Sequence, residues 1–282
     1  MSTTRNVAII GVGLIGGSIG LALHKRGLAE CVTGLGRRQE SLEKALAVGA
    51  IDRATTDPKD ALQEADLVIV ATPVASVVED ILRADQLAPR ASWITDVGST
   101  KGEICQATDK SLKGRPNRFV GSHPLAGDHR TGPENARPDL FEGRTVVITP
   151  TPATNTNTIQ LACEFWASLG AVVRSMDPAE HDRALAATSH LPHLVASALA
   201  SVTPEEYLPL AATGWGDTTR IAASDPDLWV QIFAQNSNSV IEQLDRLIDR
   251  LNQLRGALDS GSTESLRNTL QRAKEIRNAL GN

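Results

Sequence analysis

The chain of 282 residues has only three cysteines, no excess of positive charge and no apolar run as long as a membrane-spanning helix. Cys31, Cys105 and Cys163 are far apart and odd in number, which argues against a disulfide framework or a CxxC metal site and indicates free thiols in the cytoplasm. The net charge of -5 argues against a nucleic-acid partner. The length allows two globular domains of ordinary size.

The longest stretch without charge, residues 7–23, reads VAIIGVGLIGGSIGLAL. Its 17 residues include five glycines and fall short of the ~20 that a spanning helix needs, so no membrane segment or signal peptide is expected. The pattern instead predicts a buried parallel strand, a glycine turn and a helix that begins near Leu14.

The turn has the spacing GxGxxG between a strand and a helix. Its first glycine permits the tight turn, its second lets the backbone approach a pyrophosphate, and its third lets the helix pack against the strand. Amide groups at the start of the helix supply donors to phosphates. A second strand at 32–35, a helix at 39–48 and a strand at 66–71 that ends in Thr-Pro support a dinucleotide-binding fold. The expected cofactor contacts are Gly11, Gly13, Leu14, Ile15, Gly16, Thr72 and Pro73.

The second strand ends without the carboxylate that normally binds the adenosine ribose of NAD. Gly36 stands in that place, and Arg37 and Arg38 follow it. Because guanidinium groups favour phosphates and no carboxylate repels a 2′-phosphate, these three residues predict NADP in preference to NAD. Two solvated arginines at a strand end are the alternative interpretation.

Helices and strands continue to alternate up to residue 175, all extending one sheet. Asp177, Pro178 and Glu180 then have the pattern of a helix start, with an N-cap, a proline at the first position and an acidic residue three after the cap. We therefore expect an α/β, Rossmann-like doubly wound sheet over residues 1–176 and an all-helical domain over residues 177–282.

Two polar, glycine-rich loops follow strands: DVGSTKG at 96–102 and GSHPLAG at 121–127. Ligands of open α/β sheets bind at the carboxyl ends of the strands, so Ser99 and His123 are candidates for a hydroxyl and a base that face the nicotinamide. Together with GVGLIGGS, SHLPH and GDTTRIAASDPDLW, these motifs resemble the prephenate and arogenate dehydrogenase family of tyrosine biosynthesis, from Val7 to about Phe233.

The resemblance implies NAD(P)-dependent oxidative decarboxylation of a cyclohexadienol. Hydride leaves the ring carbon that bears the hydroxyl, carbon dioxide leaves opposite, and the ring becomes aromatic. Because hydride leaves more readily as the hydroxyl loses its proton, a neutral imidazole is a suitable proton acceptor, and His123 is the expected base. A histidine hydrogen-bonded at a strand end is the alternative. The family match gives Ser99 a positioning role.

Other substrate contacts are expected from the helical half. Arg220 offers a bidentate clamp for a substrate carboxylate, and Asp217 would orient its guanidinium. The resemblance places His193 and Trp229 in the substrate pocket. Histidines bonded to backbone beside the Pro192 kink are the alternative for His193, and a core tryptophan is an equally simple interpretation of Trp229. His190 shares a helix face with His193, but no third ligand has suitable spacing, so no metal is expected.

Asp128 stands where many prephenate-specific members have a threonine, and its carboxylate could pair with the ammonium group of arogenate. This predicts arogenate as the preferred small-molecule substrate. A helix that starts at Asp225-Pro226 is expected to run to about Leu258, followed by a last helix at 264–280. The first carries a narrow apolar seam, made by Leu244, Leu247, Leu251, Leu254 and Leu258. Either the last helix or a second subunit would cover this seam, and the resemblance favours a homodimer.

Two other functions fit part of the pattern. One is another NADP enzyme with a helical dimer domain, such as a β-hydroxyacid dehydrogenase or an imine reductase. The former normally needs a catalytic lysine in the helical domain, and none lies between Asp177 and Ala273. The other is a non-catalytic redox sensor that binds NADP, which would not need Ser99, His123 and Arg220 together.

Overall fold

The computed structural model describes residues 4–113, 117–127 and 130–281, and it contains one eight-stranded sheet in the order β3-β2-β1-β4-β5-β6-β7-β8. The pairs are parallel except for β6 and β7, which run antiparallel. This order confirms the expected doubly wound, Rossmann-like fold. The strands are β1 (Thr4–Ile10), β2 (Ala29–Leu35), β3 (Arg53–Thr55), β4 (Leu67–Val70), β5 (Trp93–Asp96), β6 (Phe119–Pro124), β7 (Thr145–Thr149) and β8 (Val172–Ser175).

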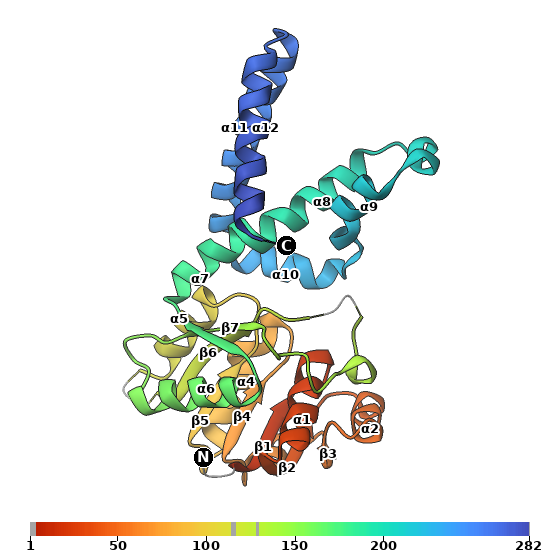
Figure 1. Ribbon diagram of the computed structural model, residues 1–282. Coiled ribbons are helices and arrows are strands. Elements are labelled where there is room, and N and C mark those ends of the chain that lie inside the picture. Colours follow the sequence, from red (N-terminus) through yellow and green to blue (C-terminus); the bar gives the residue numbers. More distant parts are fainter. Residues whose placement is uncertain (1–3, 114–116, 128–129, 282) are drawn as a thin grey trace.

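Helices cover both faces of this sheet (Figure 1). The central strands are apolar at successive positions because both of their faces are buried, as in residues 67–70. One core cluster includes Ile9, Leu23 and Trp166, and the other includes Ile10, Ile81 and Phe119. The helices of this part are α1 (Leu14–Arg26), α2 (Gln39–Ala47), α3 (Pro58–Leu62), α4 (Val74–Leu87), α5 (Gly102–Ser111), α6 (Thr156–Ser168) and the short η1 (Pro133–Asn135).

An all-helical part follows the sheet, and α7 leads from one to the other (Figure 1). Asp177 caps α7 through hydrogen bonds from the amides of Ala179 and Glu180, as its sequence pattern predicts. The elements of the all-helical part are α7 (Pro178–Leu185), η2 (Ala186–His190), α8 (Leu191–Val202), η3 (Glu205–Leu210), α9 (Thr213–Thr219), η4 (Arg220–Ala223), α10 (Pro226–Gln235), α11 (Ser237–Asp259) and α12 (Thr263–Ala279). No helix in the described ranges is both long and apolar enough to cross a membrane.

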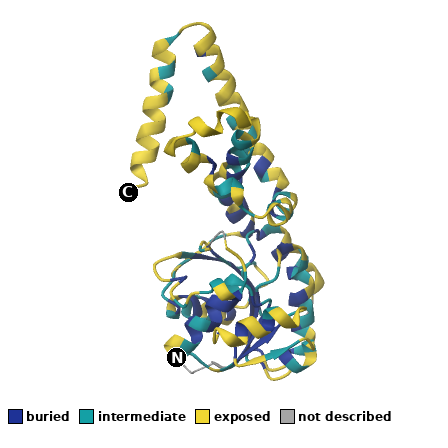
Figure 2. Ribbon diagram, turned by 90° about the vertical axis from the view of Figure 1, so that its right-hand side faces the viewer, coloured by how far each residue is buried: buried dark blue, intermediate teal, exposed yellow. Residues whose placement is uncertain are grey.

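The helices α11 and α12 form a hairpin that projects away from the rest of the molecule and is mostly exposed (Figures 1 and 2). No residue of α12 is buried, and α11 buries only Val240 and Ala257. The last helix packs on α11, yet Leu251 and Leu258 of the predicted seam stay 54% and 67% exposed. Within one chain, therefore, α12 covers only part of the seam.

Three local predictions need correction. The single helix expected from Pro226 to Leu258 is two helices, because Asn236 leaves helical geometry (φ -120°, ψ 26°) and turns its side chain to other partners. The irregularity expected at Pro192 is a π-helical turn, η2, immediately before α8; the wider turn accommodates a proline that cannot donate a backbone hydrogen bond. His123, expected in a loop, lies inside β6 and pairs with Val147 because β7 extends the ladder.

Candidate active site

The glycine turn after β1 has the geometry of a pyrophosphate site. Gly11 has a φ of 89°, and a side chain there would lie 2.7 Å from the carbonyl oxygen of Ala71, so only glycine fits. At Gly13 a side chain would meet nothing within 4 Å, which leaves the approach to the turn open. The start of α1 carries neither a side-chain cap nor an acidic residue, so its amides at Leu14 and Ile15 are available to an anion. The residues present therefore fit a dinucleotide.

The end of β2 places three predicted cofactor residues together. Gly36 follows the last residue of β2, and Arg37 and Arg38 are exposed and form no ion pair with any residue in the described part of the chain. Thr72, after β4, donates a hydrogen bond of 2.8 Å to Asp80, and its methyl group would lie 3.0 Å from a side chain added at Gly11. Two permanent cations that form no ion pair within the described residues can bind a phosphate.

The loop after β5 is fastened by a buried carboxylate. Asp96 accepts hydrogen bonds from the amides of Gly98 (2.8 Å) and Ser122 (3.2 Å), and it forms an ion pair with Lys101 in which both side chains are fully buried. The hydroxyl of Ser122 also bonds to Thr95, at 2.8 Å. These contacts fix the loop that carries Ser99 to strand β6, directly beside His123.

His123 is linked to the helical part by a chain of hydrogen bonds. Its Nδ1 lies 2.9 Å from Nε2 of His181, and Nδ1 of His181 lies 2.8 Å from Oδ1 of Asp182. Asp182 also accepts the amides of Lys101 and Gly102, each at 2.8 Å. The start of α7 therefore contacts both the predicted base and the start of α5. The sequence interpretation missed the roles of His181 and Asp182, for which the only signal was an adjacent His-Asp pair in the first turn of a helix.

Two residues of this hydrogen-bonded chain, His123 and Asp182, have different charge states. Burial, together with His181, Lys101 and His190, holds the pKa of His123 well below the usual 6.5. Burial alone would raise the pKa of Asp182, but hydrogen bonds from His181 and from two backbone amides lower it overall. At neutral pH, therefore, His123 is neutral and Asp182 is ionised.

The pKa of the nearby Cys105 thiol is raised, whereas those of His123 and Asp182 are lowered. Cys105, in α5, is buried, and this burial raises its pKa to about 12. Because a thiol acts as a nucleophile only as the thiolate, Cys105 is unsuited to covalent catalysis.

A second group of rings lies on α8 and α10. His193 stacks on Trp229 with ring centroids 3.6 Å apart and planes 8° from parallel, and its buried Nδ1 has no hydrogen-bond partner among the described residues. His190 is also buried, with a pKa lowered to about 4 by burial, and lies 3.1 Å from the side-chain nitrogen of Asn236. The same Asn236 nitrogen donates to the carbonyl of Asp182 at 2.8 Å. The break between α10 and α11 thus joins His190 to α7.

The remaining predicted residues are not linked to this network. Arg220 and Asp217 are both exposed, and they form no ion pair with each other or with any other described residue. The half-buried side chain of Ser99 forms no hydrogen bond within the described part of the chain. Asp128 lies outside the described residues.

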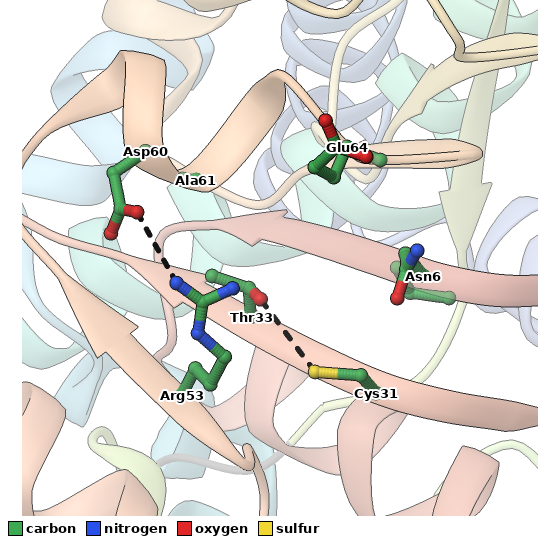
Figure 3. Close-up of a pocket in the computed structure, with 9 residues that line it drawn as sticks. Asn6, Cys31, Thr33, Arg53, Asp60, Ala61 and Glu64 are labelled. Carbon is green, nitrogen blue, oxygen red and sulfur yellow. Dashed lines mark hydrogen bonds and ion pairs between the residues drawn. The ribbon is translucent and has the colours of Figure 1, made fainter.

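A hollow at another place on the sheet does not belong to this site (Figure 3). It is lined by Asn6 and Cys31, near the starts of β1 and β2, and by Arg53 and Asp60, which form an ion pair at 3.2 Å. Those strand starts lie at the edge opposite the glycine turn, away from where ligands of doubly wound sheets bind. Across the described ranges, no group of three or more His, Cys, Asp and Glu residues is arranged to hold a metal ion.

A dinucleotide-binding sheet, a half-buried neutral histidine beside its carboxyl edge and a helical second part define a nicotinamide-dependent oxidoreductase. Family models match both parts: "Prephenate dehydrogenase, nucleotide-binding domain" over residues 19–175 and "Prephenate dehydrogenase, dimerization domain" over residues 177–272. The chain belongs to the prephenate dehydrogenase family.

Individual relatives agree with this assignment. The chain is 33% identical to prephenate dehydrogenase of Bacillus subtilis, over 97% of this chain and 76% of the relative. It is 32% identical to cyclohexadienyl dehydrogenase of Zymomonas mobilis, over 99% and 97% of the two chains. A solved structure of Aquifex aeolicus prephenate dehydrogenase, in complex with hydroxyphenyl propionate and NAD+, has a TM-score of 0.90 at 33% identity and covers 98% of each chain. Synechocystis arogenate dehydrogenase has a TM-score of 0.82 at 28% identity, over 98% and 100%.

Proposed function

We propose that this oxidoreductase catalyses the NADP-dependent oxidative decarboxylation of L-arogenate to L-tyrosine, with His123 as the general base. The observation that carries the proposal is His123 itself. It is neutral at physiological pH, hydrogen-bonded through Nδ1 to His181, and without a described partner at Nε2. An imidazole held in this way can accept the proton of a substrate hydroxyl.

The glycine turn and the two arginines would hold the cofactor. Leu14 and Ile15 would offer amides to the pyrophosphate, Thr72 and Pro73 would line the nicotinamide side, and Arg37 and Arg38 would bind the 2′-phosphate. When bound, the nicotinamide supplies the acceptor for the hydride that leaves the ring carbon bearing the hydroxyl.

The substrate would be held by residues of both parts. Arg220 is an exposed guanidinium that forms no ion pair with any described residue, as a clamp for a ligand carboxylate must be. His193 and Trp229 present a stacked pair of rings, and Ser99 lies on the loop fastened beside His123. We assign Asp217 to orienting Arg220 once substrate is bound and Asp128 to the ammonium of arogenate. Prephenate, which lacks that ammonium, is the second substrate of this proposal.

The partly uncovered seam of α11 supports a homodimer. Leu251 and Leu258 are exposed on α11, Leu270 is 65% exposed in the middle of α12, and Leu280, just after α12, is 81% exposed. Apolar surface of this kind is normally buried against a partner. We propose that a second copy covers it and that the division between the two domains falls at residues 176 and 177.

Replacing His123 with asparagine tests the base. Asparagine keeps a polar side chain but cannot accept and carry the proton, so we expect turnover to fall by ~10² or more with NADP affinity unchanged. His24 provides a matched control because it is also a half-buried, hydrogen-bonded histidine but lies at the far end of α1, where its Nδ1 bonds the carbonyl of Gly49; His24→Asn should leave turnover unchanged. Near-normal turnover of His123→Asn would remove the proposed role.

Changing the end of β2 tests the cofactor assignment. The double variant Gly36→Asp, Arg37→Ser introduces the carboxylate that binds a ribose hydroxyl and removes one phosphate ligand. At Gly36 a new side chain would contact only the flexible side chain of Leu42, at 3.1 Å, so the fold should tolerate it. We expect the ratio of kcat/KM for NADP to that for NAD to reverse. An unchanged ratio would contradict the assignment.

A further inference from the structure

The strongest unassigned feature is the hydrogen-bonded chain from His123 through His181 to Asp182, because it joins the predicted base to a carboxylate on another element. His181 is fully buried, and Asp182 is 5% exposed. Both lie at the start of α7, whereas His123 is on β6. Neither His181 nor Asp182 is needed to explain cofactor or substrate binding.

The protons along this chain follow from the charge of Asp182. A carboxylate can only accept hydrogen bonds, so Nδ1 of His181, 2.8 Å away, carries a proton. With that single proton on the ring, Nε2 of His181 is an acceptor, and it faces Nδ1 of His123 at 2.9 Å. In this arrangement Nδ1 of His123 is the protonated nitrogen, which leaves the lone pair on Nε2.

We propose that His181 and Asp182 are positioning residues that hold His123 in the Nδ1-protonated tautomer, so that its Nε2 is the proton acceptor of the reaction. The role rests on the proposed function, in which that proton comes from the substrate hydroxyl. The O–H bond breaks and an N–H bond forms at Nε2, while the proton on Nδ1 stays hydrogen-bonded to His181. The positive charge that His123 gains is opposed by Asp182 through the intervening ring.

Among the described residues, Asp182 is the carboxylate that the hydrogen-bonded chain places behind His123. The titratable groups of the described part that act on His123 directly are His181, Lys101 and His190. Lys101 is already paired with buried Asp96, and both His181 and Lys101 disfavour a proton on His123. Without Asp182 to fix His181, either nitrogen of His123 could carry its proton, and the imidazolium formed in the reaction would lose the charge that opposes it.

The same carboxylate also connects the two parts of the chain. Asp182 accepts the amides of Lys101 and Gly102 at the start of α5, and a side chain at position 102 would lie 2.8 Å from Oδ2 of Asp182. Gly102, the last residue of DVGSTKG, thus lets the Asp182 carboxylate reach the backbone amides. Docking of α7 on α5 and selection of the His123 tautomer therefore both depend on the carboxylate of Asp182.

Nitrogen-15 NMR of histidine-labelled protein tests the tautomer directly, without turnover. The chain has six histidines, and the His123→Asn variant assigns the resonance of interest. In the wild-type protein without ligands at neutral pH, we expect His123 to carry its proton on Nδ1. In Asp182→Asn, whose amide nitrogen can donate to His181, we expect His123 to shift toward the other tautomer. Observation of an Nε2-protonated His123 in the wild type would overturn the proposal.

Two substitutions of His181 separate positioning from a structural role. Glutamine can donate to Asp182 and accept from His123, so His181→Gln should keep kcat within about tenfold of wild type, whereas His181→Leu should lose ~10² or more with KM and NADP affinity little changed. Thermal unfolding of both variants controls for folding. Equal loss in the glutamine and leucine variants would overturn the positioning role.

The NMR experiment and the turnover measurements also separate this inference from the proposed function. A wild-type protein that turns over neither arogenate nor prephenate refutes the proposed function, and with it the catalytic role of His181 and Asp182. The NMR result on the tautomer stands in either case. Turnover with the wrong tautomer refutes the inference alone.

Discussion

Replacing Gly102 with alanine should destabilise the protein, although a glycine at the start of a helix is usually improved by that change. The new methyl group would lie 2.8 Å from Oδ2 of Asp182, closer than such atoms can approach. Asp182 cannot easily move aside, because its short side chain also bonds the amide of Lys101 and the ring of His181.

The magnitude follows from the contact that must yield. Moving Oδ2 away breaks the 2.8 Å hydrogen bond from the Gly102 amide. A hydrogen bond to a charged group contributes ~1.5–3 kcal/mol. Loss of the glycine's conformational freedom in the unfolded chain gives back ~0.5–1 kcal/mol. We expect a net loss of about 0.5–2.5 kcal/mol in the free energy of unfolding.

Urea unfolding of Gly102→Ala beside Gly214→Ala measures this effect. Gly214 lies in helix α9, and a side chain there would meet nothing within 4 Å, so alanine should be neutral or stabilise by up to ~1 kcal/mol. Because displacement of Asp182 also disturbs His181, kcat of Gly102→Ala should fall as well. If both variants were equally stabilised and Gly102→Ala kept full activity, the packing of Asp182 against α5 described above would be wrong.

Two further predictions concern charge. Because the pKa of His123 lies well below 6.5, the base stays neutral as the pH falls through 6.5, and kcat/KM should decline only at lower pH; a profile of kcat/KM against pH with its acidic midpoint above 6.5 would contradict this. Replacing Lys101 with methionine leaves the Asp96 carboxylate buried without its cation, which should lower the free energy of unfolding by ~3–5 kcal/mol, with part of the loss recovered by adding Asp96→Asn. Urea unfolding of the single and double variants measures this, and a Lys101→Met protein as stable as the wild type would refute the role of the ion pair.

The sheet could be predicted because its signals are local. Apolar runs such as residues 67–70, the glycine spacing after β1 and the Asp177-Pro178 cap are each set by neighbouring residues in the sequence. The short β3 has only three residues, too few to show a period, and it was not expected.

The chain behind the base could not be predicted, because it depends on distance in space. His123 and His181 are separated by 58 positions, and no spacing rule connects a strand residue to the first turn of a later helix. The break at Asn236 was hidden for the same reason. Its cause is a pair of hydrogen bonds to Asp182 and His190, which the local leucine spacing does not reveal.

The central claim is best tested by the initial rate of cofactor reduction by the purified protein with arogenate and with prephenate, each with NADP and with NAD. The account predicts the fastest rate with arogenate and NADP, with carbon dioxide released in equal amount to the reduced cofactor. Faster turnover of prephenate would contradict the role of Asp128 and the preference for arogenate. Binding of NADP with no reduction in the presence of either substrate would contradict the account as a whole.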